Sequence, residues 1–279
     1  MDATSTSVYH GNCHCGRYRF EVSVPGPLET IVCTCSLCEK KGYLWLDLSN
    51  SPFKVVRDDG DLTEYQSAVL NDQFCKYCGT GVLGEHTSGP LSGHVLVNLR
   101  AVQGLNPFHL EQSAKVVRLE GERKINPLPP TPSDPPAQHV GSCHCGNVWA
   151  ELLVSIKDQV VKEDNCSSCT RNGYIGVYPN KDQVRIHGGE RTFEYKYGKK
   201  FSGTLHCNIC GVTVFNNVYG PPLSVFDAVP PERKERVMAV YWKNVMLQPL
   251  NVRALDGIDR GTLWIERSDE GTEGYVLDP

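Results

Sequence analysis

The hexapeptide GNCHCG stands at residues 11–16 and returns as GSCHCG at residues 141–146. Two further cysteine motifs return in the same order, CTCSLC at 33–38 as DNCSSC at 164–169 and FCKYC at 74–78 as HCNIC at 206–210. The offsets between the paired motifs are 130, 131 and 132 residues. A spacing this constant indicates an internal duplication, so we expect the chain to fold as two similar units.

A proline-rich segment separates the two repeats. Six prolines fall within residues 127–136, and proline can neither donate to a sheet ladder nor stand inside a helix. We therefore predict a first domain at residues 1–125, an extended linker at 126–139 and a second domain at 140–279.

The second repeat contains an insertion near residues 212–250. The stretch NLRAVQG at 98–104 matches NVRALDG at 251–257, but with an offset of 153 residues. The insertion includes PPERKERVMAV at 230–240, in which two prolines precede a run of charged residues. This order is typical of a helix start, so the insertion is expected to contain a helix.

The segments between the cysteine motifs are short and bounded by Gly, Pro, Asn or Asp. RYRFEVSV at 17–24 and HVLVNLRAV at 94–102 are examples, rich in β-branched and aromatic residues that roughly alternate with polar ones. This pattern predicts an all-β chain with two tandem domains of antiparallel sheets.

Composition excludes several classes of partner and location. The net charge is −4, which disfavours nucleic acid as a partner. No apolar run reaches the ~20 residues of a membrane span, and the N-terminus lacks the basic and apolar regions of a secretory signal. We therefore expect a cytoplasmic protein whose thiols stay reduced, so its thirteen cysteines point to metal or thiol chemistry rather than to disulfides.

Eight of the cysteines are expected to form two structural zinc sites. Zinc at structural sites takes four tetrahedral ligands, and in each repeat the C-x-C motif can combine with the distant C-x-x-C motif. A glycine directly follows each of these cysteine pairs and gives the backbone the freedom that a tight metal-binding turn requires. The predicted ligands are Cys13, Cys15, Cys75 and Cys78 in repeat 1 and Cys143, Cys145, Cys207 and Cys210 in repeat 2.

Three cysteines then remain in repeat 1, namely Cys33, Cys35 and Cys38. Three protein ligands with an open fourth position are the pattern of a catalytic zinc, which predicts that these thiols hold a reactive ion. Two alternatives stay open, since the thiols can be buried structural cysteines or can take His14 or His109 as a fourth ligand in a closed site.

Repeat 2 departs from this pattern at one position. It carries Asp164, Cys166 and Cys169, so that a carboxylate replaces the counterpart of Cys33. Aspartate can ligate zinc, but its oxygen is a harder donor atom than the sulfur of a thiolate. Three interpretations stay open for this cluster: a weaker zinc site, no metal, or a purely scaffolding role.

The series G-x-C-H-C-G, then C-x-C-x-x-C followed by Gly-Tyr, then F-C-x-x-C-G-T and a late N-x-R resembles the family of the glutathione-dependent formaldehyde-activating enzyme and centromere protein V. Both halves resemble this family, and the second departs from the pattern at Asp164, which stands in place of one cysteine. The resemblance implies β-tent domains around a structural zinc and a reactive zinc at C-x-C-x-x-C. It also implies formation or cleavage of the carbon–sulfur bond of S-(hydroxymethyl)glutathione.

A zinc held by Cys33, Cys35 and Cys38 can bind a substrate thiol as its thiolate. Glutathione carries two carboxylates, and Arg100 with Asn98 two residues earlier on the expected strand face is the predicted anion partner. Tyr43 can line the pocket together with Trp45, and Lys40 or Lys41 can add charge. The alternatives are that the two aromatic residues belong to the core and that Arg100 forms a surface ion pair.

The function predicted is that of a zinc-dependent carbon–sulfur lyase or synthase acting on glutathione or a thiol adduct. We expect two structural zinc ions, one catalytic zinc in repeat 1 and a doubtful one in repeat 2. The two repeats are expected to pack as a pseudo-dimer within a monomer, with repeat 2 completing the pocket of repeat 1. His14 and His144 are expected to orient neighbouring groups rather than to bind metal. The alternative function is a non-catalytic zinc scaffold that binds a protein partner.

Overall fold

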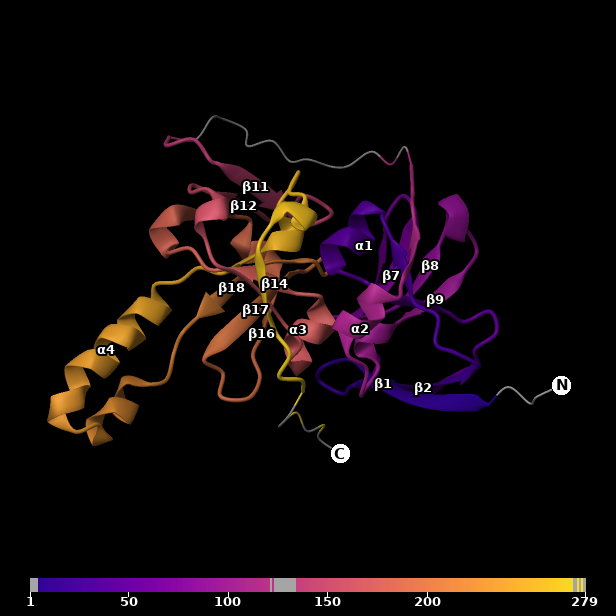
Figure 1. The fold of residues 1–279 in the computed structure, drawn as a ribbon, viewed down its shortest axis with the longest axis horizontal. Helices are drawn as coiled ribbons and strands as arrows, with labels where there is room; N and C mark the ends of the chain where they lie inside the picture. The colour runs from indigo at the N-terminus through magenta and orange to yellow at the C-terminus, as the bar shows by residue number, and fades with distance from the viewer. Residues whose placement is uncertain (1–4, 121, 123–133, 273–274, 276, 278–279) are drawn as a thin grey trace.

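The computed structural model describes residues 5–120, 122, 134–272, 275 and 277. Each half of the chain folds into a small three-stranded sheet and a larger seven-stranded sheet, and the two halves lie side by side (Figure 1). The domain boundaries at 125 and 140 stay predictions, and most of the predicted linker falls outside the described residues. Its end is held where Arg185 donates to the backbone carbonyls of Asp134 at 2.7 Å and Pro135 at 3.0 Å.

In the first half the strands and helices follow one another as β1 (Thr6–Asn12), β2 (Tyr18–Pro25), β3 (Ile31–Cys33), α1 (Ser36–Lys41), β4 (Trp45–Asp47), β5 (Phe53–Asp58), β6 (Leu62–Gln66), β7 (Leu70–Cys75), β8 (Gly81–His86), β9 (Val95–Asn98), α2 (Pro107–Gln112) and β10 (Lys115–Val117). In the second half they are β11 (His139–Ser142), β12 (Trp149–Leu152), β13 (Val161–Asp164), α3 (Ser167–Asn172), β14 (Ile175–Val177), β15 (Val184–His187), β16 (Thr192–Tyr195), β17 (Ser202–Cys207), β18 (Thr213–Val218), α4 (Pro231–Val245), β19 (Leu250–Asn251) and β20 (Ile265–Ser268).

The two halves share one topology. The large sheet runs β10-β3-β4-β9-β8-β7-β6 in the first half and β20-β13-β14-β19-β18-β17-β16 in the second, and the small sheets are β1-β2-β5 and β11-β12-β15. The predicted all-β class with two similar domains is therefore confirmed.

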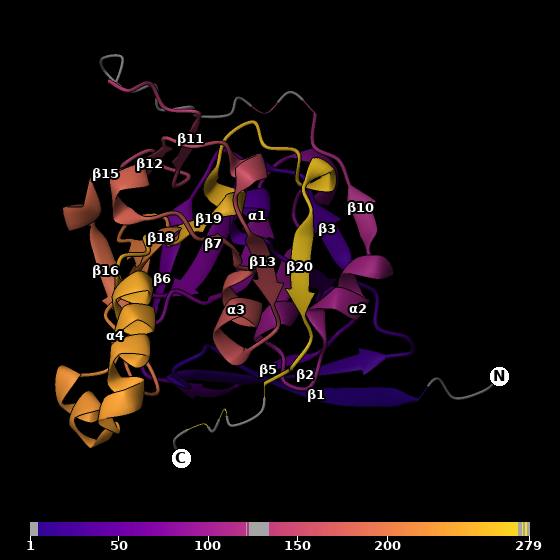
Figure 2. The same cartoon turned by 60° about the vertical axis from the view of Figure 1, so that its left-hand side comes forward.

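The expectation of purely antiparallel sheets needs one correction. At the edge of each large sheet the last strand pairs in parallel, β10 with β3 and β20 with β13. A parallel partner requires a long crossover connection, and here almost the whole repeat lies between the two paired strands (Figure 2). Alternation within a single strand carries no information about the direction of its neighbour.

The interface between the halves is continuous with the core. Trp45 and Leu96 of the first half belong to the same buried cluster as Val177 and Leu250 of the second. Apolar burial is the dominant favourable term in folding. The two repeats are therefore expected to stabilise each other rather than to behave as separate beads.

Helices α1 and α3 meet through their C-terminal glycines. Gly42 and Gly173 end the two helices with φ of +64° and +53°, a conformation that glycine adopts without steric cost. A Cβ on Gly173 would lie 2.6 Å from the carbonyl oxygen of Lys41 and 3.0 Å from the Cα of Gly42. This close approach packs the C-terminal ends of the two helices against each other across the interface of the repeats.

The predicted helix of the insertion is confirmed as α4, which projects from the second half (Figure 1). The short helices α1, α2 and α3 were not predicted, because six residues are too few for a periodic apolar pattern. Among the described residues, every helix is too short or too polar to cross a membrane.

Candidate metal centres and the cleft between the repeats

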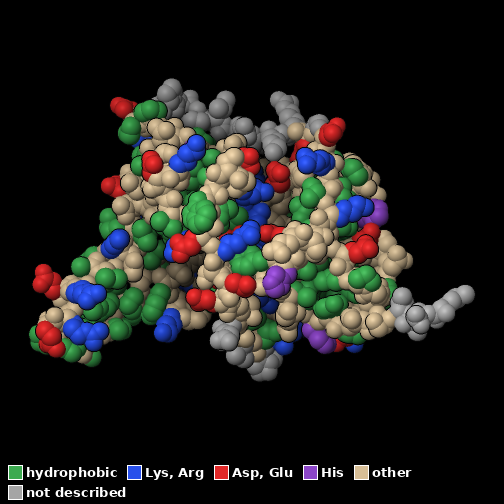
Figure 3. All heavy atoms as spheres, in the orientation of Figure 1, with side chains coloured by type: hydrophobic (Ala, Val, Ile, Leu, Met, Phe, Trp, Pro, Cys, Tyr) green, Lys and Arg blue, Asp and Glu red, His purple; other side chains and the backbone are tan. Residues whose placement is uncertain are grey.

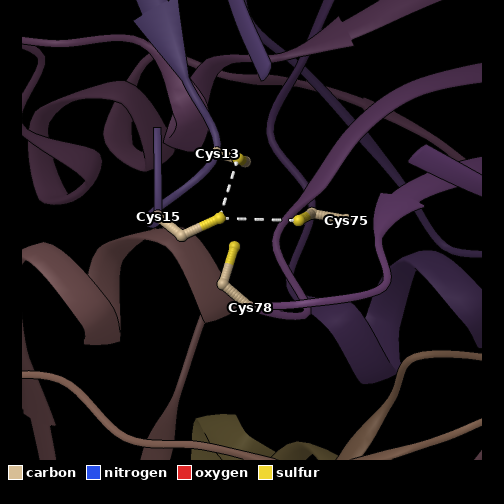
Figure 4. A group of neighbouring side chains, drawn as sticks. All are labelled: Cys13, Cys15, Cys75 and Cys78. Carbon is tan, nitrogen blue, oxygen red and sulfur yellow. Dashed lines mark hydrogen bonds between the residues drawn. The ribbon is translucent and has the colours of Figure 1, made fainter. Parts of the chain in front are cut away.

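The predicted four-cysteine cluster of repeat 1 is assembled in the structure. Figure 4 shows the four side chains converging from the β1–β2 turn and the turn after β7. The Sγ atom of Cys15 lies 3.5 Å from that of Cys13 and 3.7 Å from that of Cys75, and all four sulfurs, including that of Cys78, lie within 4.8 Å of one another. A tetrahedral zinc with bonds of about 2.3 Å separates its sulfurs by about 3.8 Å. The donor set and its spacing therefore fit a zinc ion.

The four-cysteine cluster of repeat 2 has the same geometry. The Sγ atom of Cys145 lies 3.5 Å from those of Cys143 and Cys207, and Cys210 completes a group within 4.8 Å. In both repeats the first sulfur accepts a backbone N–H bond of 3.3 Å, from Tyr18 on Cys13 and from Val148 on Cys143. Such bonds orient ligand sulfurs for a metal.

The glycines that follow the cysteine pairs adopt the left-handed conformation that the sequence predicts. Two of them also pack against the opposite repeat, because a Cβ on Gly79 would overlap the ring of His206 and a Cβ on Gly211 would lie 2.8 Å from the ring of Phe74. The four positive φ angles are those of Gly16, Gly79, Gly146 and Gly211.

The three-cysteine cluster of repeat 1 is built around the start of α1. Cys33 ends β3, and Cys35 is the N-cap residue whose side chain accepts a hydrogen bond from the backbone N–H of Cys38. The three sulfurs lie within 4.8 Å of one another, and the three residues are at most 3% exposed. Trp45 donates its indole N–H to the Sγ atom of Cys38 at 3.2 Å.

Asp164, Cys166 and Cys169 form the equivalent cluster of repeat 2, also within 4.8 Å. The Oδ1 atom of Asp164 accepts the backbone N–H of Cys166 at 2.6 Å, as the Sγ atom of Cys33 accepts that of Cys35 at 3.4 Å. All three residues of this cluster are half-buried. The aspartate thus takes over the local bonding of the missing cysteine in a more open setting.

His14 and His144 cross the interface between the repeats. The His14 ring contacts the hydroxyls of Tyr195 at 2.8 Å and Ser167 at 3.0 Å, and the His144 ring contacts those of Tyr65 at 2.8 Å and Ser36 at 3.0 Å. Burial, with a smaller effect of nearby Arg171, lowers the pKa of His14 to about 4, so its ring is neutral near pH 7. Each histidine therefore ties the metal-binding turn of one repeat to the cluster helix of the other.

The alternative that His14 or His109 is a fourth ligand of the three-cysteine cluster is not supported. Neither residue belongs to the group that Cys33 forms with the other two thiols. The His14 ring is engaged across the interface, and His109 is exposed on α2.

A cavity of about 410 Å³ opens beside this cluster. Cys33, Cys38 and Tyr43 of repeat 1 line one part of it, and Arg253, Arg260 and Arg267 of repeat 2 line another. Figure 3 shows basic and acidic side chains mixed where the two halves meet. The cavity therefore combines sulfur ligands of one repeat with cations of the other.

Two of these arginines are held by Glu163, which is buried, and Glu111, which is half-buried. Arg267 donates to Glu163 at 3.1 Å, and Arg253 lies 3.4 Å from Glu111 and 3.6 Å from Glu163. Burial and the neighbouring Arg100 and Arg260 lower the pKa of Arg253 to about 10.

Arg260 differs from these arginines in having no carboxylate as an ion-pair partner among the described residues. Within the described part of the chain, no carboxylate oxygen lies within ion-pair distance of its guanidinium. It is half-buried and lines both this cavity and a neighbouring one of about 470 Å³. Its charge is thus available to an anion that enters the cleft.

Asn98 and Arg100 lie next to this cleft but bond to protein groups. The Asn98 amide donates to the carbonyl of Gly81 at 2.8 Å and accepts the backbone N–H of Arg100. Arg100 is in a 3₁₀ turn at Leu99–Ala101, so the expectation that it continues the strand face of Asn98 is wrong. The side-chain carbonyl of Asn98 caps this turn and ends the strand.

The Arg100 side chain forms a buried rather than a surface ion pair. Its Nε donates to the carbonyl of Gly42 at 2.5 Å, and its Nη2 pairs with Glu111. Tyr43 donates its hydroxyl to Asp72 at 2.5 Å, and Lys41 pairs with the same carboxylate. Tyr43 is therefore both a core residue and part of the cavity wall, while the substrate-binding roles of all three predicted residues stay predictions.

Sequence reasoning missed Glu111, Arg260 and Arg267 as residues of the cleft. None of them belongs to a repeated motif, and Arg260 and Arg267 join Cys33 in one cavity only because the two repeats pack together. For Arg253 the sequence did carry a signal, because N-x-R at 98–100 is repeated at 251–253 and makes Arg253 the counterpart of Arg100.

Comparisons with known proteins give one family and one solved structure. Residues 8–113 match the family model described as glutathione-dependent formaldehyde-activating enzyme. A crystal structure of a Rhodobacter sphaeroides protein is similar with 23% sequence identity over 46% of this chain and 99% of that chain, at a TM-score of 0.31. The matched residues span the first repeat, including its seven cysteines. The first repeat is therefore similar to the glutathione-dependent formaldehyde-activating enzyme family.

Proposed function

We propose that the protein is a zinc-dependent carbon–sulfur lyase or synthase that forms, breaks or rearranges a C–S bond of glutathione or a glutathione adduct. The reaction takes place at Cys33, Cys35 and Cys38. The observation that carries this proposal is the cavity of about 410 Å³, in which two of these thiols face cationic residues of the second repeat. The match of residues 8–113 to the glutathione-dependent formaldehyde-activating enzyme model independently supports chemistry with glutathione.

Cys33, Cys35 and Cys38 would hold the zinc ion, which when bound would stabilise a substrate thiolate near neutral pH. The chain itself keeps this centre dry, since Cys33, Cys35 and Cys38 are almost fully buried. The indole N–H of Trp45 partly neutralises the Cys38 sulfur. Hydrogen bonds to ligand sulfurs tune the charge that a metal presents to its substrate.

Arg260 is the residue that we propose as the partner of a glutathione carboxylate. Arg253 and Arg267 are already bonded to Glu111 and Glu163, whereas no described carboxylate pairs with Arg260. A guanidinium binds a carboxylate through two parallel hydrogen bonds, which fixes orientation as well as adding energy. Arg100 contributes by holding Glu111 in place.

The second repeat completes this site. Its arginines and Glu163 form a wall of the cavity, and its Ser167 and Tyr195 fix the His14 turn of the first repeat. We therefore propose that the chain is an internal pseudo-dimer with one principal active site. A monomeric state and a cytoplasmic location stay predictions.

The test replaces Cys35 by Ser in the full chain and measures metal content together with turnover of S-(hydroxymethyl)glutathione and related adducts. We expect one metal ion to be lost and turnover to fall by at least 100-fold, because the thiolate set is incomplete. Cys166→Ser in the second repeat is the matched control and is expected to retain turnover. Loss of the metal with unchanged turnover rejects the proposal.

The scaffold alternative predicts a different result in the same assay. Two tightly bound ions, no third ion and no turnover of any glutathione adduct by the wild-type protein would favour a structural role. Turnover that depends on Cys35 excludes the scaffold alternative.

A further inference from the structure

The helix of the insertion, α4, is a part of the second repeat that the first repeat lacks, and the proposed function does not use it. It projects from the body of the molecule (Figure 1). Its C-terminal end is fixed by two backbone bonds. The N–H of Lys181 donates to the carbonyl of Met246 at 2.9 Å. The N–H of Gln248 donates to the carbonyl of Pro179 at 2.8 Å. The orientation of the helix is therefore set by the segment that follows β14.

Close packing of α4 against the rest of the chain is confined to a narrow line. A Cβ on Gly220 would lie 2.7 Å from the ring of Tyr241 and 3.0 Å from the side chain of Val245. The rings of Phe226 and Tyr241 meet edge-on with their centroids 5.1 Å apart. All residues of α4 are described by the structure and none is buried, although helices are normally stabilised by burying an apolar face. The apolar face of α4 is therefore incompletely covered by the protein.

A groove with a volume of about 840 Å³ runs along this face. Its opposite wall comes from the end of β18 at Val218 and from Phe201, which precedes β17. Figure 3 shows hydrophobic side chains along the projecting helix. Residues at positions i, i+3, i+4 and i+7 share one side of a helix, and the helix wall has this spacing at Arg233, Arg236, Val237 and Val240.

The size and shape of the groove favour a small molecule over a protein. Pockets for small ligands measure about 300–1,000 Å³ and are lined mainly by apolar side chains with a few polar groups, as this one is. A stable protein interface needs about 800 Å² of surface on each partner. The space here is instead bounded by a helix on one side and a sheet edge on the other, which fits a narrow hydrocarbon chain.

The charged side chains of the groove favour an anion. Arg233 and Arg236 lie in the first two turns of α4, where the helix dipole also attracts negative charge. Within the described residues, no carboxylate oxygen lies within ion-pair distance of either guanidinium, and the nearby carboxylate of Asp227 pairs with Lys234 at 3.8 Å. Glu232 also lines the groove, so that its three charged side chains still sum to +1. The lining is therefore apolar along most of its length and cationic at the start of the helix.

We propose that the groove between α4 and the β17–β18 edge binds an amphipathic anion with an unbranched hydrocarbon chain and one carboxylate. The carboxylate meets Arg233 and Arg236, and the hydrocarbon lies against Val240 and Val245. Val245 lies about 14 Å along the helix axis from Arg236, at about 1.5 Å per residue, which suits an extended chain of about twelve carbons. The groove shares no lining residue with the cavity beside Cys33. It is therefore a second site that depends neither on the metal nor on the proposed reaction with glutathione.

The test titrates the full chain with dodecanoate, hexanoate and dodecyltrimethylammonium, each below its micelle concentration, and measures binding by calorimetry. We expect one dodecanoate per chain. Hexanoate should bind at least tenfold more weakly because it buries less hydrocarbon, and so should the cation because the arginines repel it. Arg233→Gln combined with Arg236→Gln should weaken dodecanoate at least tenfold and abolish its preference over the cation. Val240→Glu places a charge against the hydrocarbon and should weaken both long-chain probes.

Lys234→Gln combined with Lys243→Gln is the matched control. The double variant removes the same charge from the same helix, but neither lysine lines the groove in the described part of the chain. Its affinity for dodecanoate should stay within twofold of the wild-type value. An equal loss in the lysine and arginine variants would show that only the net charge of the helix acts, which overturns the assigned carboxylate contact.

Three further outcomes overturn the proposal. Wild-type protein that does not bind dodecanoate has no such site. Binding that persists unchanged in Val240→Glu is adsorption elsewhere on the surface. Self-association of the wild-type chain that Val240→Glu abolishes, measured by sedimentation, assigns the groove to a second copy of the chain. None of these results bears on the proposed function, which Cys35→Ser tests separately.

Discussion

The three-residue clusters of the two repeats differ although the same fold builds them. In each repeat a strand ends at the first ligand and a six-residue helix begins at the second. In repeat 1 the cluster consists of three buried thiols, whereas in repeat 2 it consists of a carboxylate and two thiols, all half-buried. The comparison shows that the same backbone brings three side chains together in each repeat. The identity of these side chains then decides how exposed the cluster is and how soft its donor atoms are.

The largest expected effect comes from breaking the clusters that the repeats share. Cys75→Ser and Cys207→Ser each remove one ligand of a four-thiol site. Binding of structural zinc supplies on the order of 10 kcal/mol in small zinc domains, so each variant should lose its ion and unfold cooperatively. Because the halves share a core, either substitution is expected to destabilise both.

Metal analysis and thermal unfolding followed by circular dichroism check this expectation. Cys166→Ser is the control, since it lies in a half-buried three-ligand cluster. A variant at Cys207 that leaves the melting of repeat 1 unchanged would contradict the idea of a shared core.

A second experiment converts the repeat 2 cluster toward that of repeat 1. Asp164→Cys supplies three thiolates, and soft ligands favour zinc. We expect the zinc affinity of this cluster to rise by at least tenfold, measured by competition with a chromophoric chelator. No gain in this variant would show that backbone differences, not ligands, separate the two sites.

A third prediction concerns Trp45, whose counterpart in repeat 2 is Gly176. Trp45→Phe keeps most of the buried volume but removes the N–H bond to the Cys38 sulfur. Loss of an outer hydrogen bond to a metal ligand costs about 10- to 100-fold in affinity or activity. We expect this loss at the repeat 1 cluster alone, with the repeat 2 cluster as the internal control in the same chelator titration.

Removing the charge of Arg260 from the cleft should have a moderate effect on the binding of a glutathione adduct. Arg260→Ala is expected to raise the KM for a glutathione adduct about tenfold with kcat little changed, because a carboxylate contact is worth about 1.5–3 kcal/mol at most. Arg260→Lys should recover part of this loss. Arg236→Ala on the exposed face of α4 is the control, and an equal KM change there would remove Arg260 from the binding site.

The smallest effect is expected at the paired tyrosines of the interface. Tyr65→Phe removes a hydroxyl that bonds to His144, and Tyr195→Phe removes one that bonds to His14, each in the opposite repeat. Each should cost about 1 kcal/mol of unfolding free energy, and Tyr195→Phe more than Tyr65→Phe because Tyr195 is the more buried. Urea unfolding of the two single variants measures this, and a larger loss in Tyr65→Phe would show that burial of the tyrosine does not set the size of the effect.

Much of the architecture could be predicted from spacing. The constant offset of the cysteine motifs predicts two similar domains, and the alternation of short segments predicts their strands. Both predictions rest on local features of the sequence, because a duplicated motif keeps its spacing and a strand keeps its alternation. The parallel edge pairs β10–β3 and β20–β13 could not be predicted, because they join strands from opposite ends of a repeat.

The candidate site was predictable only in its ligands. Cys33, Cys35 and Cys38 are close in sequence, so their meeting is a local event at a helix start. Arg100 was placed on the wrong kind of element, because the side-chain oxygen of Asn98 turns the chain at the end of β9.

The sequence by itself determined the duplication, the all-β class and the cysteine clusters, because these depend on spacing and on the chemistry of thiols. Tertiary structure alone decided that Arg260 lines the same cavity as the thiols and that Glu111 holds Arg100 and Arg253. These contacts join residues that are distant in the chain or that lie in different repeats. Their geometry is set by how the two sheets of each half pack and how the halves bury a common core.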